Sequence, residues 1–465
     1  MTMTPQDATY RADPAIGEIA DFIGDHVAAA QFPQTILRFR NDRAAAEVGL
    51  AGLSDDAWIS HFGRFAPLDG NLPQPLALRY HGHQFRHYNP DIGDGRGFLF
   101  AQLRDRDGRL LDLGTKGSGQ TPYSRFGDGR LTLKGGVREI LATEMLDALG
   151  VNTSKTFSII ETGEALHRGD ELSPTRGAVM LRLSHGHIRI GSFQRLATLD
   201  ETEALRRLAR YALAVYYGES DTDDPAARLF EHVVARTADL AASYMVAGFV
   251  HGVLNTDNIN ISGESFDYGP WRFTPKFDGR FTAAYFDEQG LYAFGRQAEA
   301  IHWNLVQLAR ALVTVSDQAQ LITSLDAFAP AYQRAIVRRM LARLMVQSRS
   351  ESEDVALVQS IEQALTRGDV EIDRFFFDWA GGRLRSASAA TAYEAAPFQQ
   401  FAALVSHYAP FGPLADAYWQ GLAPCSMHID EVEAIWSHIA NADDWQPLYA
   451  KVDAIRAMGL ALLQR

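Results

Sequence analysis

Asn258 and Asp267 are the residues of this sequence whose types and spacing most directly indicate chemistry. Asn258 ends the string His251-Gly-Val-Leu-Asn-Thr-Asp-Asn258, which follows a long apolar helical pattern, and Asp267 opens the string Asp267-Tyr-Gly269. An amide oxygen and a carboxylate that converge from separate loops suit Mg²⁺ when phosphate oxygens complete the coordination shell. The pair therefore predicts a divalent metal site that works together with phosphate groups.

Three features upstream of these loops suit phosphate binding. The glycine-rich string Gly93-Asp-Gly-Arg-Gly97 lets backbone N–H groups approach phosphates closely. Lys116 ends a β-like run, and Glu139 lies in the next helical pattern, where a carboxylate can hold the ammonium group in place. Each feature alone has an ordinary reading, because glycine-rich strings are mostly turns and single charged side chains are mostly solvated. Because they occur together and in this order along the chain, the combination is more informative than any single feature.

In this order the features predict an α+β, protein-kinase-like fold, with a β-rich N-lobe, a helical C-lobe and the nucleotide between them. One position departs from a kinase. A kinase has an aspartate two residues after the loop histidine, where it accepts the proton of the substrate hydroxyl, but Val253 stands there in this chain. The nearest carboxylate, Asp257, is displaced along the loop. Ordinary γ-phosphoryl transfer is therefore disfavoured: either the protein is inactive, or its substrate lies differently in the cleft.

Local patterns predict the elements that must position these residues. The string Asp105-Arg-Asp-Gly108 separates β-like runs at 98–103 and 110–116, which predicts a hairpin with its turn at Asp107-Gly108. Helices are expected at 16–30, 137–149 and 227–247, and strands at 156–160 and 178–183. This texture divides the chain into an N-terminal extension (1–75), a β-rich nucleotide-binding lobe (76–195) and a helical lobe with the catalytic and metal-binding loops (196–465).

Several longer strings resemble the selenoprotein O family of kinase-fold pseudokinases. They are Leu113-Gly-Thr-Lys-Gly-Ser-Gly-Gln-Thr-Pro-Tyr-Ser-Arg125, the string that ends at Asn258, Asp267-Tyr-Gly-Pro270 and, further on, Phe377-Asp-Trp-Ala-Gly-Gly382. The resemblance implies a protein adenylyltransferase, an enzyme of AMPylation. ATP would lie reversed relative to a kinase, so that a Ser, Thr or Tyr hydroxyl of a protein attacks the α-phosphate and pyrophosphate leaves.

The resemblance also implies a role for each site residue. Asp257 would be the catalytic base, Asn258 and Asp267 would bind Mg²⁺ or Mn²⁺, and Glu139 would orient Lys116. The ATP-binding residues would be Gly93, Gly95, Arg96, Lys116, Asp128, Gly129, Arg182, Arg189 and Asp267. Of these, Lys116 and the two arginines would hold the inward-pointing phosphates, because guanidinium groups match phosphate oxygens. From the residues alone, Arg182 and Arg189 could equally form structural ion pairs.

Composition narrows the functional classes. The net charge of −13 and a pI of about 5.5 argue against nonspecific nucleic-acid binding, which needs an excess of basic residues. Cys425 is the single cysteine, so no internal disulfide is expected, which suits a reducing compartment. No apolar run is long enough to span a membrane. We expect a cytoplasmic protein with no membrane partner. The family it resembles often ends in a redox-active cysteine, but Leu460-Ala-Leu-Leu-Gln-Arg465 lacks one, so the sequence leaves redox regulation open.

Two alternatives to AMP transfer stay open on the sequence. The first is an ATP-dependent phosphotransferase, against which Val253 argues. The second is an inactive nucleotide-binding pseudokinase scaffold, against which the metal ligands argue, because a scaffold has no chemical need for both Asn258 and Asp267. The expected partners are ATP and proteins that present Ser, Thr or Tyr hydroxyls.

Overall fold

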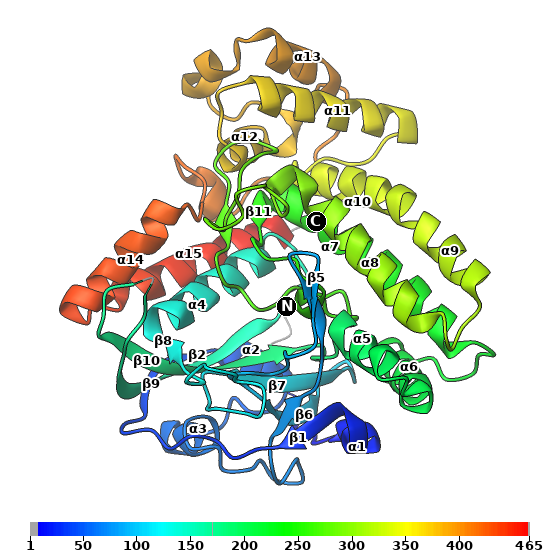
Figure 1. Ribbon diagram of the computed structural model, residues 1–465. Coiled ribbons are helices and arrows are strands. Elements are labelled where there is room, and N and C mark those ends of the chain that lie inside the picture. The colour runs from blue at the N-terminus through cyan, green and yellow to red at the C-terminus, as the bar shows by residue number, and fades with distance from the viewer. Residues whose placement is uncertain (1–7, 170, 464–465) are drawn as a thin grey trace.

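The protein has a mixed α/β fold built on one antiparallel sheet of eight strands (Figure 1). The computed structural model describes residues 8–169 and 171–463. The strand order is β1-β3-β6-β7-β10-β9-β2, and β8 pairs with β10. The strands are β1 Gly24–His26, β2 Ile36–Arg40, β3 Leu76–Leu78, β6 Leu99–Arg104, β7 Leu110–Lys116, β8 Leu131–Thr132, β9 Lys155–Leu166 and β10 Thr175–Ser184. Two smaller pairs are β4 Gly82–Gln84 with β5 His87–Asn89, and β11 Phe249–Val250 with β12 Arg272–Phe273.

Strand β10 has apolar side chains on both faces of the sheet, so helices must pack on both faces. Val179, Leu181 and Leu183 pack into the core that holds α2 (Asp42–Glu47) and α3 (Asp55–Phe62), whereas Ala178 and Met180 pack into the core that holds α4 (Leu133–Ala148). Side chains alternate between the faces of a strand, so Arg182 belongs to the α4 face. By the same alternation along β7, Lys116 lies on that face too. The sheet thereby brings both cations to the side of the helix that carries Glu139.

The predicted hairpin is confirmed as β6 and β7, which pair antiparallel with Leu103 opposite Leu111. Gly108 adopts the left-handed φ of 81° that the turn requires. The helix expected at 137–149 is confirmed as α4, although it begins earlier, at Leu133, where the Thr132 side chain accepts a hydrogen bond from the Gly135 N–H. The strands expected at 156–160 and 178–183 are confirmed within β9 and β10.

The helix expected at 16–30 is wrong beyond Ile23. A 3₁₀ turn η1 (Ala15–Ile19) and a short helix α1 (Ala20–Ile23) give way at Gly24 to strand β1, which pairs with β3. Strand β2 pairs with β9 at the opposite edge of the sheet. Pairing with distant strands has overridden the local helical pattern, which a single-sequence reading cannot anticipate. Residues before 75 thus contribute both edge strands of the main sheet.

Helices make up most of the chain after β10. They are α5 Ile190–Thr198, α6 Thr202–Tyr217, α7 Pro225–Ala247, α8 Gln297–Leu312, α9 Gln318–Asp326, α10 Phe328–Arg343, α11 Glu351–Arg367, α12 Ile372–Asp378, α13 Ala396–Val405, α14 Ile429–Ala442 and α15 Gln446–Leu463, with 3₁₀ turns η2 Thr256–Asn258, η3 Phe294–Arg296, η4 Ala380–Gly382, η5 Ala387–Tyr393 and η6 Ala417–Gln420. The helix expected at 227–247 is confirmed as α7. It ends at Gly248, whose φ of 70° is the left-handed conformation that commonly terminates a helix.

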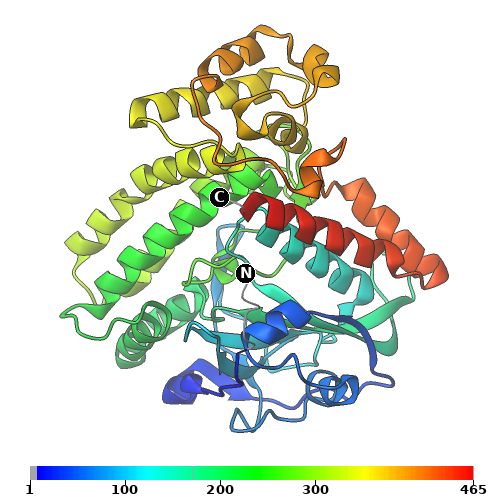
Figure 2. The same cartoon turned by 180° about the vertical axis from the view of Figure 1, so that it is seen from behind.

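The last two helices return to the sheet. Both α14 and α15 pack against α4, and Figure 2 shows α15 lying along it. Arg456 of α15 donates two hydrogen bonds to the buried carboxylate of Glu144 on α4, at 2.6 and 2.8 Å. Gly459 allows the close approach, since a Cβ there would lie 3.1 Å from the Ala148 Cα. The helix that carries Glu139 is therefore covered by the end of the chain.

Two further observations bear on the expectations from composition. Within residues 8–169 and 171–463, no helix combines the length and the apolar character that crossing a membrane requires. Cys425 is half-buried, and burial raises the pKa of its thiol, which lowers its reactivity as a nucleophile.

Candidate active site

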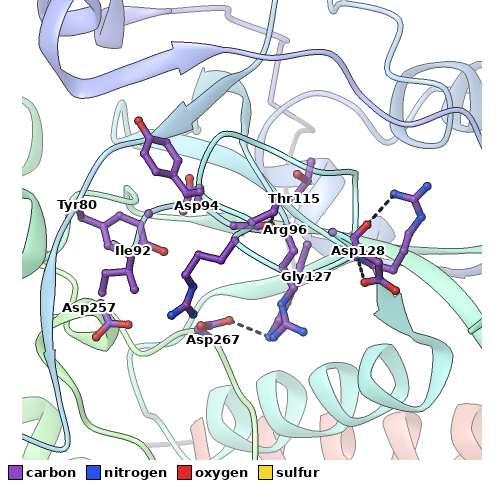
Figure 3. Close-up of a pocket in the computed structure, with 18 of the residues that line it drawn as sticks. Tyr80, Ile92, Asp94, Arg96, Thr115, Gly127, Asp128, Asp257 and Asp267 are labelled. Atoms are coloured by element: carbon purple, nitrogen blue, oxygen red, sulfur yellow. Dashed lines mark hydrogen bonds and ion pairs between the residues drawn. The ribbon is translucent and has the colours of Figure 1, made fainter. Parts of the chain in front are cut away.

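A cavity of about 560 Å³ lies between the glycine-rich loop, the ends of β7 and β10, and the two loops that carry Asp257 and Asp267. Figure 3 shows these two aspartates on one side of the cavity, with Asp94 and Arg96 of the glycine-rich loop opposite and Asp128 at the far end. The structure brings together on this wall ten of the predicted site residues: Gly93, Gly95, Arg96, Lys116, Asp128, Gly129, Arg182, Arg189, Asp257 and Asp267. Glu139 and Asn258 are outside the cavity wall.

Lys116 is the centre of a buried ion-pair cluster. Its Nζ lies 2.5 Å from the Glu139 Oε1 and 2.8 Å from the Asp267 Oδ1. Glu139 stands behind Lys116 on α4 and is almost fully buried. A buried ammonium needs such partners, because an isolated charge in the interior is strongly disfavoured. Glu139 thus holds the ammonium in the position where it faces the cavity, at the spacing that the sequence predicted.

Arg182 and Arg189 are buried guanidinium groups, each of which forms one ion pair, with Asp267 at 3.7 Å and with Asp94 at 3.2 Å, and leaves other nitrogens without a hydrogen bond. Arg182 comes from β10, and Arg189 precedes the first turn of α5. Both stack on Phe266, with guanidinium carbons 5.2 and 4.9 Å from the ring centroid. Their buried Nε atoms, and the Arg182 Nη1, have no hydrogen-bond partner in the part of the chain that the structure describes. Buried unpaired donors cost about 1–3 kcal/mol each, so this arrangement favours an anionic ligand.

Asp267 balances part of this positive charge. Its Oδ1 lies 3.7 Å from the Arg182 Nη1, in addition to its contact with Lys116. Burial alone would raise the pKa of the Asp267 carboxyl, but Lys116, Arg182 and Arg96 together hold this pKa well below its usual range. The residue adopts a left-handed backbone conformation with φ of 62°, which aspartate and asparagine tolerate better than most residues.

Asp257 is a buried carboxylate on the turn η2. Burial raises the pKa of its carboxyl to about 6, against the opposing effect of the positive charge of Arg189. Arg189 also donates a hydrogen bond from Nη1 to the Asp257 carbonyl oxygen, at 3.1 Å. The Asp257 Oδ1 is buried and has no hydrogen-bond partner among the described residues. Asp257 lines the cavity, and a buried carboxyl with a raised pKa at this position is suited to accept a proton.

Asn258 and Val253 are joined across the same loop. The Asn258 side-chain amide donates to the Val253 carbonyl oxygen at 3.0 Å, and this bond leaves the amide oxygen Oδ1 available. The loop is tied to Asp267 by His251, whose Nε2–H donates to the Phe266 carbonyl oxygen at 3.0 Å. In the described residues no three His, Cys, Asp or Glu side chains converge on a metal position. Two hard oxygen ligands fit Mg²⁺, which often takes its other ligands from water and phosphates.

The glycine-rich loop is held by close packing. A Cβ on Gly93 would lie 2.4 Å from the Tyr123 ring, and one on Gly97 would lie 2.1 Å from the Thr115 carbonyl oxygen. The loop 117–130 supports it from the other side, because the Thr121 and Ser124 hydroxyls donate to the carbonyl oxygens of Asp94 and Gly95, both at 2.5 Å. These glycines therefore have a structural requirement independent of any bound phosphate.

We expect Gly97→Ala to displace the glycine-rich loop, because the Thr115 carbonyl oxygen is backbone and cannot turn away. The free energy of unfolding should fall by about 1–3 kcal/mol, a typical cost of overpacking, and ATP affinity should fall with it. Denaturant unfolding and calorimetric titration with ATP measure the two effects. Gly52→Ala is the matched control, since a Cβ there meets nothing within 4 Å. Wild-type stability and affinity in Gly97→Ala would show that the loop accommodates the methyl group.

Some cavity residues were not predicted from the sequence. At the far end, Arg168 forms an ion pair with the predicted Asp128 at 2.8 Å, and the exposed Phe126 also lines the cavity. Near Asp257, Gln84 of strand β4 also faces the cavity. None of these residues belongs to a motif. Residues 82–89 form a short hairpin, and only the tertiary fold places it against the loop that carries Asp257.

The fold and the cavity define a class of protein. The sheet and the loops direct three buried cations, a buried carboxylate and a part-exposed carboxylate at one cavity. This arrangement is suited to a substrate with several negative charges and to proton transfer beside it.

Comparison with known proteins then identifies the family. The sequence profile described as protein adenylyltransferase SelO matches residues 8–404. A protein nucleotidyltransferase YdiU from Synechococcus elongatus is 42% identical, with 99% of this chain and 97% of the relative covered. Proteins of the same name from Gloeobacter violaceus and a Synechocystis species are 43% and 49% identical, covering 96% and 75% of this chain and 94% and 73% of the relatives. The chain belongs to the protein adenylyltransferase SelO family, which confirms the resemblance found in the sequence.

Proposed function

We propose that the protein transfers AMP from ATP to Ser, Thr or Tyr hydroxyls of other proteins. The observation that carries this proposal is the set of unpartnered guanidinium nitrogens of Arg182 and Arg189, buried beside Lys116. Three cations in this position suit the β- and γ-phosphates of an inward-pointing triphosphate. The family is described as one of protein adenylyltransferases and its relatives are named protein nucleotidyltransferases, which supports the same reaction.

Each proposed residue has a defined task in this reaction. Asp257 accepts the proton of the attacking hydroxyl. The hydroxyl oxygen forms a bond to the α-phosphorus, the bond from that phosphorus to the bridging oxygen of the β-phosphate breaks, and pyrophosphate leaves. Glu139 keeps Lys116 directed at the phosphates. The remaining ATP-binding residues of the proposal line the nucleotide: Gly93, Gly95, Arg96, Asp128 and Gly129.

Asn258 and Asp267 are the proposed ligands of Mg²⁺ or Mn²⁺. Such an ion, when bound, neutralises charge on the triphosphate and on the departing pyrophosphate. Asp267 forms ion pairs with Lys116 and Arg182. We therefore propose that metal and ATP bind together, because the phosphates offer the two cations a new partner and free the carboxylate.

We also propose that the fold is a two-lobed, protein-kinase-like one. The β-rich nucleotide-binding lobe would comprise residues 76–195, and the helical lobe 196–465. The main sheet with α4 and the helices from α6 to α13 support this division. Residues before 75, proposed as an N-terminal extension, add β1 and β2 to the sheet, and α14 and α15 cross back to α4.

ATP labelled separately at the α- and γ-phosphates distinguishes AMP transfer from phosphoryl transfer. With α-labelled ATP we expect covalent label on a protein, either the enzyme itself or an added substrate. With γ-labelled ATP we expect the label in free pyrophosphate only. Electrophoresis and thin-layer chromatography measure the two fractions.

The Asp257→Asn variant is the control for this measurement, because it keeps the size of the side chain and loses the proton acceptor. Covalent γ label without α label would overturn AMP transfer in favour of a kinase. Absence of both labels from protein, with ATP still bound, would favour the inactive scaffold.

A further inference from the structure

The hairpin β4–β5 lies against the catalytic loop, although the two are far apart in the sequence. The His83 N–H donates to the Thr256 Oγ1 at 2.7 Å, and the Phe85 N–H donates to the Asn255 Oδ1 at 3.0 Å. Tyr292 donates to the same Asn255 oxygen at 2.7 Å. The two residues that precede Asp257 are therefore fixed by the backbone of one strand.

Gln84, between these two donors, reaches Asp257 itself. Its Nε2 lies 3.4 Å from the Asp257 Oδ2, a long contact of the kind that often tightens when substrate binds. The orientation of its amide follows from its neighbours. The Asn89 Oδ1 accepts from the Asp91 N–H at 2.9 Å, so the Asn89 Nδ2 donates to the Gln84 Oε1 at 3.0 Å. The Gln84 NH₂ group must then face the carboxylate.

The space around Asp257 makes this contact selective between its two oxygens. A Cβ on Gly82 would lie 3.0 Å from the Asp257 Oδ1, so the glycine leaves room for that oxygen and no more. Gln84 contacts Oδ2, whereas Oδ1 has no hydrogen-bond partner among the described residues. Oδ1 is therefore enclosed beside Gly82, and Oδ2 is the oxygen that Gln84 contacts.

The turn of the hairpin is strained, and its surroundings hold it. Phe85 and Arg86 both adopt the left-handed conformation, with φ of 49° and 64°. Their contacts are with the helical part of the chain. The Phe85 ring packs on Tyr292 at 5.1 Å, and the Arg86 Nη2 lies 3.1 Å from the Glu299 Oε1. Such strain persists only where the surrounding structure fixes it, and it is concentrated at functional sites.

We propose that Gln84 is a positioning residue for Asp257: held by Asn89 on the hairpin β4–β5, it orients the carboxylate toward the substrate hydroxyl. This inference rests on the proposed function, in which Asp257 is the proton acceptor. Gln84 itself contacts neither the hydroxyl nor the phosphates in this scheme.

Gln84→Met tests the inference, because it keeps the length of the side chain and removes the donor. We expect kcat for AMP transfer to fall roughly 10- to 100-fold, the scale of a hydrogen bond to a charged group, with the KM for ATP changed less than about twofold. Asn89→Asp should act in the same direction without touching Asp257, since it would turn the Gln84 amide around. In an Asp257→Asn background, Gln84→Met should cause no further loss.

His87→Ala is the matched control on the same hairpin. Its side chain is exposed, so wild-type kcat is expected. Unchanged kcat in Gln84→Met would overturn the inference, and so would an equal loss in the wild-type and Asp257→Asn backgrounds, which indicates a merely structural effect. If the wild type transfers no α label at all, both the proposed function and this inference are wrong. Failure confined to the Gln84 variants leaves the proposed function standing.

Discussion

Asp267→Asn is expected to abolish AMP transfer, with a loss of at least roughly 10³-fold in kcat. The substitution removes the charged ligand of the proposed metal ion, which supplies several kcal/mol of charge stabilisation in reactions of this type. Asparagine is preferred to alanine as the replacement, because asparagine tolerates the left-handed backbone of this position, where φ is 62°. Alanine should lose the same activity and also some stability. Single-turnover transfer from α-labelled ATP, measured over a range of Mg²⁺ and Mn²⁺ concentrations, gives the result.

ATP binding in the absence of metal provides the control for Asp267→Asn. The variant leaves Lys116 and Arg182 without their anionic partner in the cavity. We therefore expect metal-free ATP to bind as tightly as to the wild type, or more tightly, in calorimetric titration. Full metal-dependent activity in Asp267→Asn would mean that the metal ligands are assigned wrongly.

Asp257→Asn is expected to lower the rate of transfer by roughly 10²- to 10⁴-fold, the range for loss of a general base. The affinity for ATP should stay near that of the wild type, because a proton acceptor acts in the transition state more than in the ground state. The Asp257 Oδ1 has no hydrogen-bond partner among the described residues, so the substitution leaves no donor stranded at that oxygen. Rates and ATP affinities measured on the same preparation test both parts.

Asp128→Ala is the contrasting variant for this prediction. Asp128 lies at the opposite end of the cavity, where it is held by Arg168. It should weaken ATP binding while kcat at saturation stays close to that of the wild type. If Asp257→Asn loses ATP binding instead of rate, Asp257 is part of the nucleotide or metal site. An unchanged rate would remove it from the mechanism.

The residues that sequence reasoning brought together are those fixed by short-range geometry. Lys116 ends a strand and Glu139 lies on the next helix, so their meeting follows once the hairpin and α4 are recognised. Asp257 and Asp267 belong to contiguous strings, and these strings carry their own loop geometry. The resemblance to the family rested on the same strings, and the comparisons confirm it over nearly the whole chain.

What sequence reasoning missed depends on pairing between distant segments. Nothing in residues 82–89 indicates that they pack on residues 255–257, because hydrogen bonds between His83 and Thr256 have no sequence signature. The edge strand β1 was mistaken for helix, since its pairing with β3 is a tertiary contact. The direction of the Asn258 amide, turned toward Val253, also depends on the folded loop.

The packing of α15 on α4 has a consequence for how the protein is made. Glu144 of α4 contacts both Asn41 and Arg456, so one buried carboxylate joins the beginning, the middle and the end of the chain. During synthesis the helix that carries Glu139 must wait for more than 300 further residues before Arg456 arrives. Contacts of such separation form late and slow folding, and they leave apolar surface exposed meanwhile. The face of α4 that α15 covers is therefore expected to stay exposed during synthesis for long enough to bind a chaperone.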